Sequence, residues 1–250
     1  MHQGEYKGKN ADSKAKRILI LGESHHWSAE DWELLPNETE EQAEKRRKKK
    51  AKNYTTEKIV ENYLENYKTH DNRASAYRFF DKIVLSFGID PEQHREKFWS
   101  NFYFGNFVEV LCGIKDGVAK ETLKKKSGDR THREIYNDNL FNFINKNKID
   151  VVVCFGRMVF DNLPSLNKEH LDEESPKKNG EIIKNGKIKQ GIKIGKSNDY
   201  IGKCIYLPNI DHKNTKVILE KRLEVYSLRH PSAAGGYNPE NYVDVLKELL

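Results

Sequence analysis

Short runs of consecutive apolar residues alternate along the chain with longer stretches in which apolar residues recur at helical spacing. Residues 18–21 are apolar at adjacent positions, and so are residues 150–155 after the first of them, Asp150, which is typical of strands buried on both faces of a sheet. Further strands are predicted at 102–111, 204–207 and 224–228, and helices at 56–67, 74–87, 131–147 and 239–250. This alternation predicts a three-layer α/β/α fold with a mostly parallel central sheet.

The length of 250 residues fits a single domain with insertions. Residues 1–15 are polar and are expected to form a flexible tail. The domain then covers residues 16–250, with a helical expansion at 28–70 and a lysine- and glycine-rich insertion at 165–203. Two Asn-Gly pairs, at 179–180 and 185–186, are hairpin turn signals within that insertion.

Charge leaves two interpretations open. The net charge of +6 fits either an ordinary lysine-rich surface or a protein with an anionic partner such as nucleic acid. The basic cluster at 46–50 follows acidic residues 38, 40 and 41 and a Thr39–Gln42 capping box, so it can simply complement a helix dipole. Alternatively, the cluster is a stripe that contacts phosphates.

The three cysteines, Cys112, Cys154 and Cys204, lie too far apart for a disulfide framework or a Cys-x-x-Cys metal site. No signal peptide and no apolar run of membrane-spanning length is visible, so a cytoplasmic protein without a membrane partner is expected. We expect no metal and no cofactor.

Reactive side chains follow the first and the last predicted strand. Glu23, Ser24 and His25 come directly after residues 18–21, and His230 comes directly after residues 224–228. Sites in open α/β sheets form outside the carboxyl ends of parallel strands. These four side chains are therefore expected around one cleft.

Four landmarks in this order make the chain resemble the uracil-DNA glycosylase superfamily. They are Gly22-Glu23-Ser24-His25 after the first strand, Asn106 in an aromatic strand, Val-Val-Val-Cys-Phe-Gly at 151–156, and His230-Pro231-Ser232 after the last strand. The resemblance covers residues 17–250 apart from the two expansions. The resemblance implies the three-layer fold of that superfamily. It also implies an enzyme that hydrolyses the N-glycosidic bond of a flipped, uracil-like base in single- or double-stranded DNA.

The resemblance also implies roles for particular residues. His230 would stabilise the departing base, and Asn106 would pair with the base edge. Trp27, Phe104 or Phe107 would stack on the base. Ser232, Gly235 and Gly236 belong to the loop that enters the minor groove, in which Tyr237 could replace the usual wedge residue.

The first motif departs from the family pattern. Ser24 stands where the family often has Asp or Asn, and His25 replaces the usual proline. Glu23 is the available carboxylate, so it would position the attacking water beside Gly22. Iron–sulfur branches of the family use four cysteines, and this chain has three.

Two other functions are compatible with these residues. A Gly-Asp-Ser-Leu-type hydrolase would use Ser24 as nucleophile and His230 as base, although Ser227 stands where its acid is expected. The other is a catalytically degenerate module of the same fold that binds nucleic acid or a nucleotide without cleavage. A monomer is expected in each case. Glu23 distinguishes binding from catalysis: a carboxylate tied to a helix or a lysine favours binding, and one within hydrogen-bond reach of a pocket water opposite His230 leaves catalysis possible.

Overall fold

The protein is a mixed α/β protein with a mostly parallel central sheet, as the sequence predicts. The computed structural model describes residues 4–26, 29–66, 75–112, 118–165, 182–184, 187–189, 201–232 and 236–250. The sheet has the order β1-β3-β2-β6-β10-β9. Its strands are β1 (Tyr6–Lys7), β2 (Ile18–His26), β3 (Tyr103–Cys112), β6 (Val151–Phe155), β9 (Gly202–Tyr206) and β10 (Leu223–Leu228).

The four inner strands are parallel, and the two edge strands are antiparallel to their neighbours. The chain goes from β2 outward to β3 and then returns past β2 to β6 and β10. The direction of winding therefore reverses between β2 and β6. In open α/β sheets, ligands bind outside the carboxyl ends of the strands at such a switch point.

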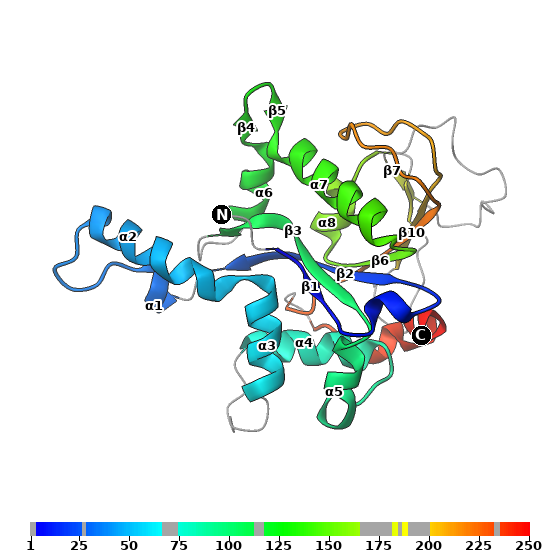
Figure 1. Cartoon of the computed structure of the whole chain (residues 1–250), viewed down its shortest axis with the longest axis horizontal. Coiled ribbons are helices and arrows are strands. Elements are labelled where there is room, and N and C mark those ends of the chain that lie inside the picture. Colours follow the sequence, from blue (N-terminus) through cyan, green and yellow to red (C-terminus); the bar gives the residue numbers. More distant parts are fainter. Residues whose placement is uncertain are drawn as a thin grey trace.

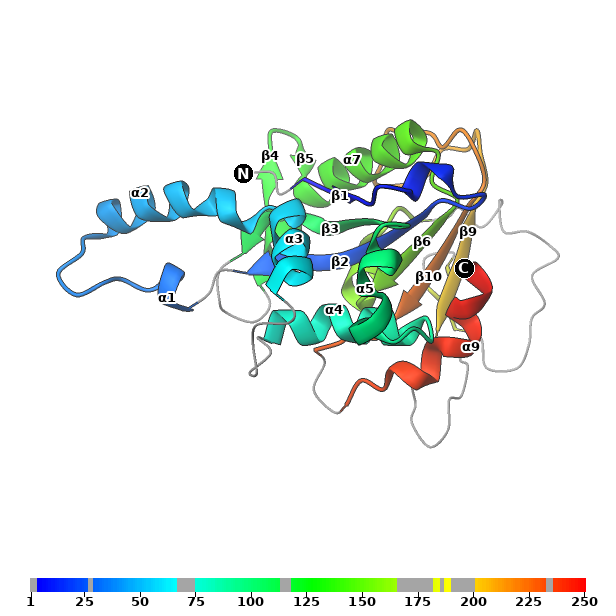
Figure 2. The ribbon, with the colours of Figure 1, turned by 60° about the horizontal axis from the view of Figure 1, so that its bottom comes forward.

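Helices pack on both faces of the sheet (Figures 1 and 2). Leu19 and Leu21 point into one apolar cluster, whereas Ile18 and Ile20 point into the other, because successive side chains of a strand alternate between faces. The first cluster contains side chains of α6 (Val118–Lys124), α7 (His132–Asn147) and α8 (Arg157–Asn162). The second contains side chains of α3 (Thr56–Asn66), α4 (Ser75–Ser86), α5 (Pro91–Trp99) and α9 (Val243–Leu246).

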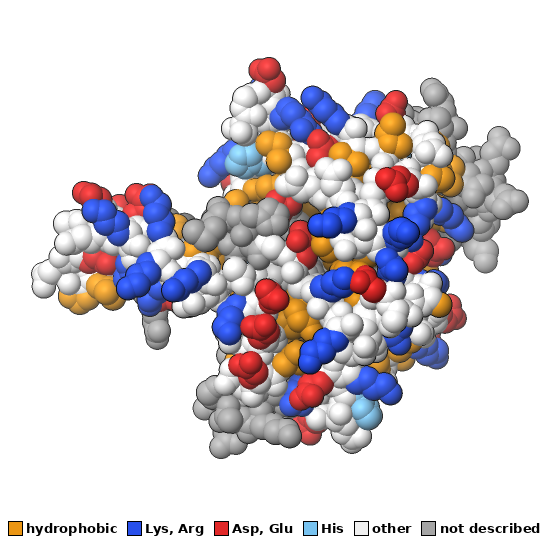
Figure 3. Space-filling view, in the orientation of Figure 1, with side chains coloured by type: hydrophobic (Ala, Val, Ile, Leu, Met, Phe, Trp, Pro, Cys, Tyr) orange, Lys and Arg blue, Asp and Glu red, His pale blue; other side chains and the backbone are white. Residues whose placement is uncertain are grey.

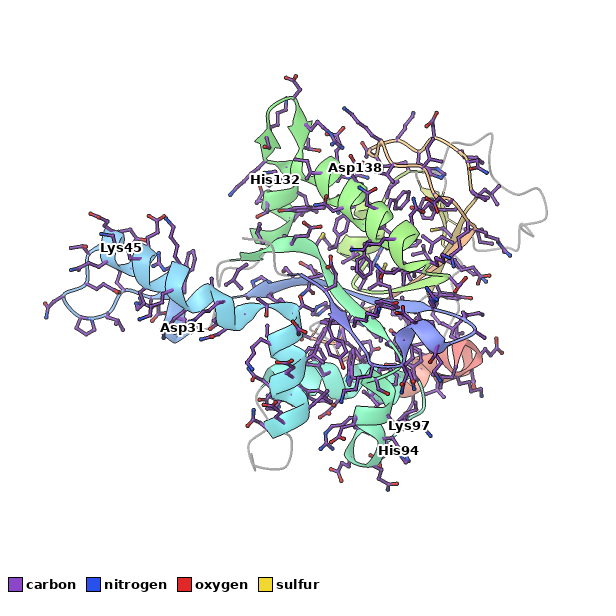
Figure 4. All side chains as sticks on the ribbon, in the orientation of Figure 1. Asp31, Lys45, His94, Lys97, His132 and Asp138 are labelled. Atoms are coloured by element: carbon purple, nitrogen blue, oxygen red, sulfur yellow. The ribbon has the colours of Figure 1, made fainter. Side chains whose placement is uncertain are left out.

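An arm formed by α1 (Ala29–Trp32), α2 (Glu40–Lys50) and the 3-10 helix η2 (Ala51–Tyr54) projects from this body (Figures 1 and 2). The predicted capping box is present: Thr39 accepts from the Gln42 amide, and Gln42 accepts from the Thr39 amide. The acidic end of α2 points outward, and its basic end returns to the body. Figure 4 places Lys45 on the arm and Asp31 where the arm joins the body.

The amino-terminal segment differs from the expected tail. Within the described part, Tyr6–Lys7 forms β1 against β3, and the 3-10 helix η1 (Ala11–Ser13) follows. Backbone bonds from Gly8 to Phe102 and from Asn10 to Ser100 hold it in place. Backbone pairing of this kind leaves no hydrophobic pattern in the sequence, which is why a tail was expected.

The remaining elements are short. The predicted carboxy-terminal helix is broken into η4 (Pro239–Tyr242), α9 and η5 (Lys247–Leu249). Two hairpins complete the described elements, β4 (Lys126–Ser127) with β5 (Arg130–Thr131), and β7 (Ile182–Lys184) with β8 (Lys187–Lys189). The second hairpin lies in the predicted insertion, most of which is outside the described residues. No described helix is long and apolar enough to cross a bilayer.

Candidate active site

A cleft of about 780 Å³ opens at the switch point of the sheet. β2 pairs with β6 only from Ile18 to Leu21, yet it continues beside β3 as far as His26. β6 and β10 have already ended at Phe155 and Leu228, so a gap is left beside the end of β2. The cleft is lined by Glu23, Ser24, His25, His26, Asp31, Lys50, Asn53, Tyr54, Ile59, Asn62, Tyr77, Phe79, Phe80, Phe104, Asn106, His230 and Ser232.

Gly156 lets two of these groups approach the same point. It follows β6 with a φ of +140°, a conformation that favours glycine. A Cβ atom here would lie 3.5 Å from Cδ2 of His230 and 3.8 Å from Oε2 of Glu23. The ends of β2 and β10 thus bring a carboxylate and an imidazole together across this glycine.

His230 is held as a neutral imidazole with a known tautomer. Its Nδ1 accepts a hydrogen bond from the Ser232 amide at 3.2 Å. Burial, with smaller effects of His26 and Lys82, lowers the pKa of His230 to about 4. The proton at neutral pH is therefore on Nε2, which has no acceptor among the described residues. The ring presents an N–H donor to the cleft.

Glu23 is a partly buried carboxylate. Burial raises its pKa, and the nearby His26 opposes this shift more weakly. No described lysine or arginine forms an ion pair with Glu23. Glu23 lines the cleft and is not tied to a described lysine or arginine, which leaves catalysis possible.

The raised pKa of Glu23 predicts a pH-dependent stability effect of Glu23→Gln. Because the folded state binds this proton more tightly than the unfolded state, the free energy of unfolding falls as pH rises through the window between the two pKa values. Glutamine has no titrating carboxyl group, so the variant does not lose this part of the free energy of unfolding. The variant should therefore gain melting temperature relative to the parent as the pH rises above about 4, the usual pKa of a free glutamate. The exposed Glu240→Gln is the control for loss of one charge, and a difference independent of pH would contradict the prediction.

Asn106 contains a buried donor that has no partner in the described structure. It pairs in register with Gly22 of the neighbouring strand, and its Nδ2 atom is buried without a hydrogen bond. A Cβ atom on Gly22 would fall well inside van der Waals contact with Oδ1 of Asn106. The glycine therefore makes the space that the amide occupies. Unpaired buried donors are rare in folded proteins, and they are costly unless a ligand or water completes them.

Aromatic rings form the apolar wall of the cleft. Phe104 lines it and also packs edge-on against Phe80. Phe107, the third predicted stacking residue, lies in the opposite core with Tyr136, because strand alternation turns it away from Phe104. Trp27 lies outside the described residues. The sequence analysis missed Phe79 of α4, a half-buried ring whose centroid is 5.4 Å from that of His230.

Ser24 and His25 both have polar partners. Ser24 Oγ is hydrogen-bonded to His26 Nε2 at 2.9 Å. His25 lines the cleft, but its Nε2 is bonded to the buried Thr56 hydroxyl at 3.1 Å, and burial lowers its pKa to about 4. This contact fixes the start of α3 against the end of β2.

The loop after His230 is only partly described. Ser232 is exposed at the cleft, and Gly236 has a φ of +83° with open space where a Cβ would lie. Gly235 lies outside the described residues. Tyr237 is not a wedge: it is buried, its hydroxyl is 2.6 Å from Ser86 Oγ, and its ring stacks on Tyr242.

The root of the arm contributes a polar wall that the sequence analysis did not anticipate. Asp31 accepts hydrogen bonds from Lys50 and, at 2.7 Å, from the Tyr54 hydroxyl, and Lys50 lowers the pKa of Asp31. Two members of the basic cluster are structural. Arg46 binds Glu38 and two backbone carbonyls, and Arg47 lies over the Trp32 ring.

No group of three or more His, Cys, Asp or Glu residues in the described structure could hold a metal ion. The chain matches no protein-family model, and the search of curated proteins finds no relative. What the protein has is thus an α/β fold of the open-sheet class, with a polar and aromatic cleft at its switch point. Its function must be argued from the chemistry of that cleft.

Proposed function

We propose that this protein has a uracil-DNA glycosylase-like fold and removes a base from DNA by hydrolysing its N-glycosidic bond. The observation that carries the proposal is a pair of unused donors in one cleft. His230 offers Nε2–H, and Asn106 offers a buried Nδ2 without a partner in the described structure. Two such donors suit the edge of a base that carries two carbonyl acceptors, such as uracil.

The reaction needs both a stabilised leaving group and a placed nucleophile. As the bond between C1′ and the base breaks, its electron pair goes to the base. A water oxygen forms the new bond to C1′, and the proton that this water loses neutralises the departed base. A fixed neutral donor such as His230 stabilises the negative charge that develops on the base. Glu23, which forms no ion pair with a described lysine or arginine and lies close to Gly156, is suited to hold the water.

The shape and surroundings of the cleft fit a flipped nucleotide. Phe79 and Phe104 give rings on which a planar base can lie. The exposed Lys49 and Lys52, which make no ion pair with a described residue, adjoin the cleft-lining Lys50 and Asn53. Figure 3 shows that the arm carries acidic as well as basic side chains on the face in view. The lysines at its root are therefore the better candidates for phosphate contacts than the arm as a whole.

The decisive experiment is a glycosylase assay on uracil-, hypoxanthine- and thymine-mismatch oligonucleotides, single- and double-stranded. The parent should release a base, and Glu23→Gln should release it much more slowly. Absence of release from every substrate, with protein in excess over DNA, would rule out excision of these bases. A gel shift in the same samples would then identify a DNA-binding protein without this activity.

The lysines beside the cleft give a prediction for binding. The double variant Lys49→Glu/Lys52→Glu should bind DNA more weakly at low salt. The slope of log affinity against log salt should also fall by roughly one to two, because each lost phosphate contact removes about 0.7–0.9 from that slope. Lys16→Glu/Lys97→Glu makes the same charge change at a second cavity, beside the start of β2 (Lys97 is labelled in Figure 4). Equal losses in both variants would indicate general attraction rather than contacts at the arm.

The 2.9 Å bond between Ser24 and His26 is the one observation that favours the hydrolase alternative, since a nucleophile and its base need such contact. The base would then be His26 rather than His230. Ser24→Ala separates the two functions. Base excision should persist in this variant, whereas labelling of the parent by a fluorophosphonate probe, lost in Ser24→Ala, would support a serine hydrolase.

A further inference from the structure

A lysine of helix α4 contacts the backbone of the His-Pro-Ser loop. Lys82 Nζ donates a hydrogen bond of 2.7 Å to the carbonyl oxygen of Pro231, the residue between His230 and Ser232. One turn further along α4, Ser86 is bonded to Tyr237 on the other side of the loop. Lys82 also lies 5.9 Å from the centre of the Tyr237 ring. The helix thus holds both ends of the segment that follows His230.

The Pro231 carbonyl occupies a sensitive position. It precedes the Ser232 amide in the same peptide unit, and that amide donates to Nδ1 of His230. A bond that fixes the carbonyl of a planar peptide also fixes the direction of its N–H. The ammonium of Lys82 therefore orients the donor that sets the tautomer of His230.

The same ammonium acts on the charge of the ring. Among the described titratable side chains, Glu23 approaches the same glycine as His230, His26 of β2 acts on the pKa of the ring, and Arg229 precedes His230 in the chain. Burial is the main reason why the pKa of His230 is low, and His26 and Lys82 each add to the effect. A half-buried cation beside an imidazole disfavours a second positive charge.

We propose that Lys82 is a positioning residue that holds His230 in the orientation and the neutral form required for donation from Nε2. This inference rests on the proposed function for its kinetic consequence, but its structural consequence can be measured without any substrate. Protonation of Nδ1 would place a proton where the Ser232 amide donates, so the ring would have to move. Loss of Lys82 should make that protonation easier.

The test is an NMR titration of the histidine side chains in the parent, Lys82→Met and Lys82→Arg, with the His230 signal assigned by its loss in His230→Asn. The pKa of His230 should rise by roughly 0.5–1 unit in Lys82→Met. It should stay near the parent value in Lys82→Arg, which keeps the charge and a donor. Lys247→Met, which removes a lysine paired with Asp244, is the matched control and should have no effect.

An unchanged pKa of His230 in folded Lys82→Met would overturn the proposal, as would an equal rise in Lys82→Arg. If Lys82→Met does not fold, Lys82→Gln takes its place, because glutamine keeps a hydrogen-bond donor but carries no charge. In single-turnover excision, the acid limb of the pH–rate profile should move to higher pH in Lys82→Met, by the same number of pH units as the pKa of His230 rises. Substrate affinity should change little. A parent without excision activity would remove only this kinetic arm, so failure of the proposed function is distinguishable from failure of the role of Lys82.

Discussion

Replacement of His230 by alanine should lower the single-turnover rate of base excision by about two to three orders of magnitude. That is the usual effect of removing one fixed donor from a developing anion. The side chain is half-buried, neutral and held through Nδ1, so alanine removes the Nε2–H donor without leaving a buried charge unpaired. The measurement is base release at saturating protein, which separates the chemical step from DNA binding.

Phe79→Leu is the companion variant for this experiment. It alters the ring that lies 5.4 Å from the imidazole but keeps the donor, so it should affect affinity more than the rate at saturation. A rate for His230→Ala within a factor of three of the parent would show that His230 is not part of the reaction. The melting temperature of each variant shows whether the site rather than the fold was changed.

Replacement of Gly22 by alanine should lower the excision rate by about 100-fold while the protein stays folded. The added methyl group would overlap Oδ1 of Asn106 and push the amide out of its place in the cleft. Displacement of a substrate-orienting group by about 1 Å can cost a factor of this size. The readouts are the excision rate and the near-ultraviolet circular dichroism spectrum of the same sample.

A double-mutant cycle shows whether this effect passes through Asn106. In an Asn106→Ala background, the methyl group at position 22 meets no amide, so Gly22→Ala should cause little further loss. Full additivity of the two losses would mean that Gly22 acts on something other than Asn106. The cycle thus tests the register pair directly.

Much of the fold could be predicted because the apolar runs and the helical periods are local. The strand expected at 150–155 is observed as Val151–Phe155, and the helix expected at 131–147 as His132–Asn147. What could not be predicted depends on partners far away in the sequence. β1 exists because the backbone of residues 6–10 pairs with β3 and the turn before it. The extension of β2 to His26 depends on β3 in the same way.

The residues of the candidate site also divide into those that a local pattern predicts and those that only distant partners bring to the cleft. Glu23 and His230 could be proposed because each follows a recognisable apolar strand, whereas Asn106 was proposed from the family resemblance; all three line the cleft. The prediction that Phe107 stacks on a base in the cleft was wrong. Side chains alternate along a strand, so the position next to Asn106 lies on the other face of the sheet. Asp31 and Tyr54 carried no signal, and Lys50 was noted only as part of the basic cluster, since only the return of the arm to the body brings these residues to the cleft.

The parallel core has a consequence for how the molecule is made. Arg17 and Asp150, 133 positions apart, are joined at the start of the central strands, and β10 then adds to the far side of β6. A chain whose stabilising contacts join residues so far apart in the sequence must close large loops before those contacts form. The entropy cost of loop closure slows folding. No short segment of the chain can form the cleft before the sheet is complete. Its carboxylate, amide and imidazole come from the first, second and last inner strands, so they meet only when the whole sheet has assembled.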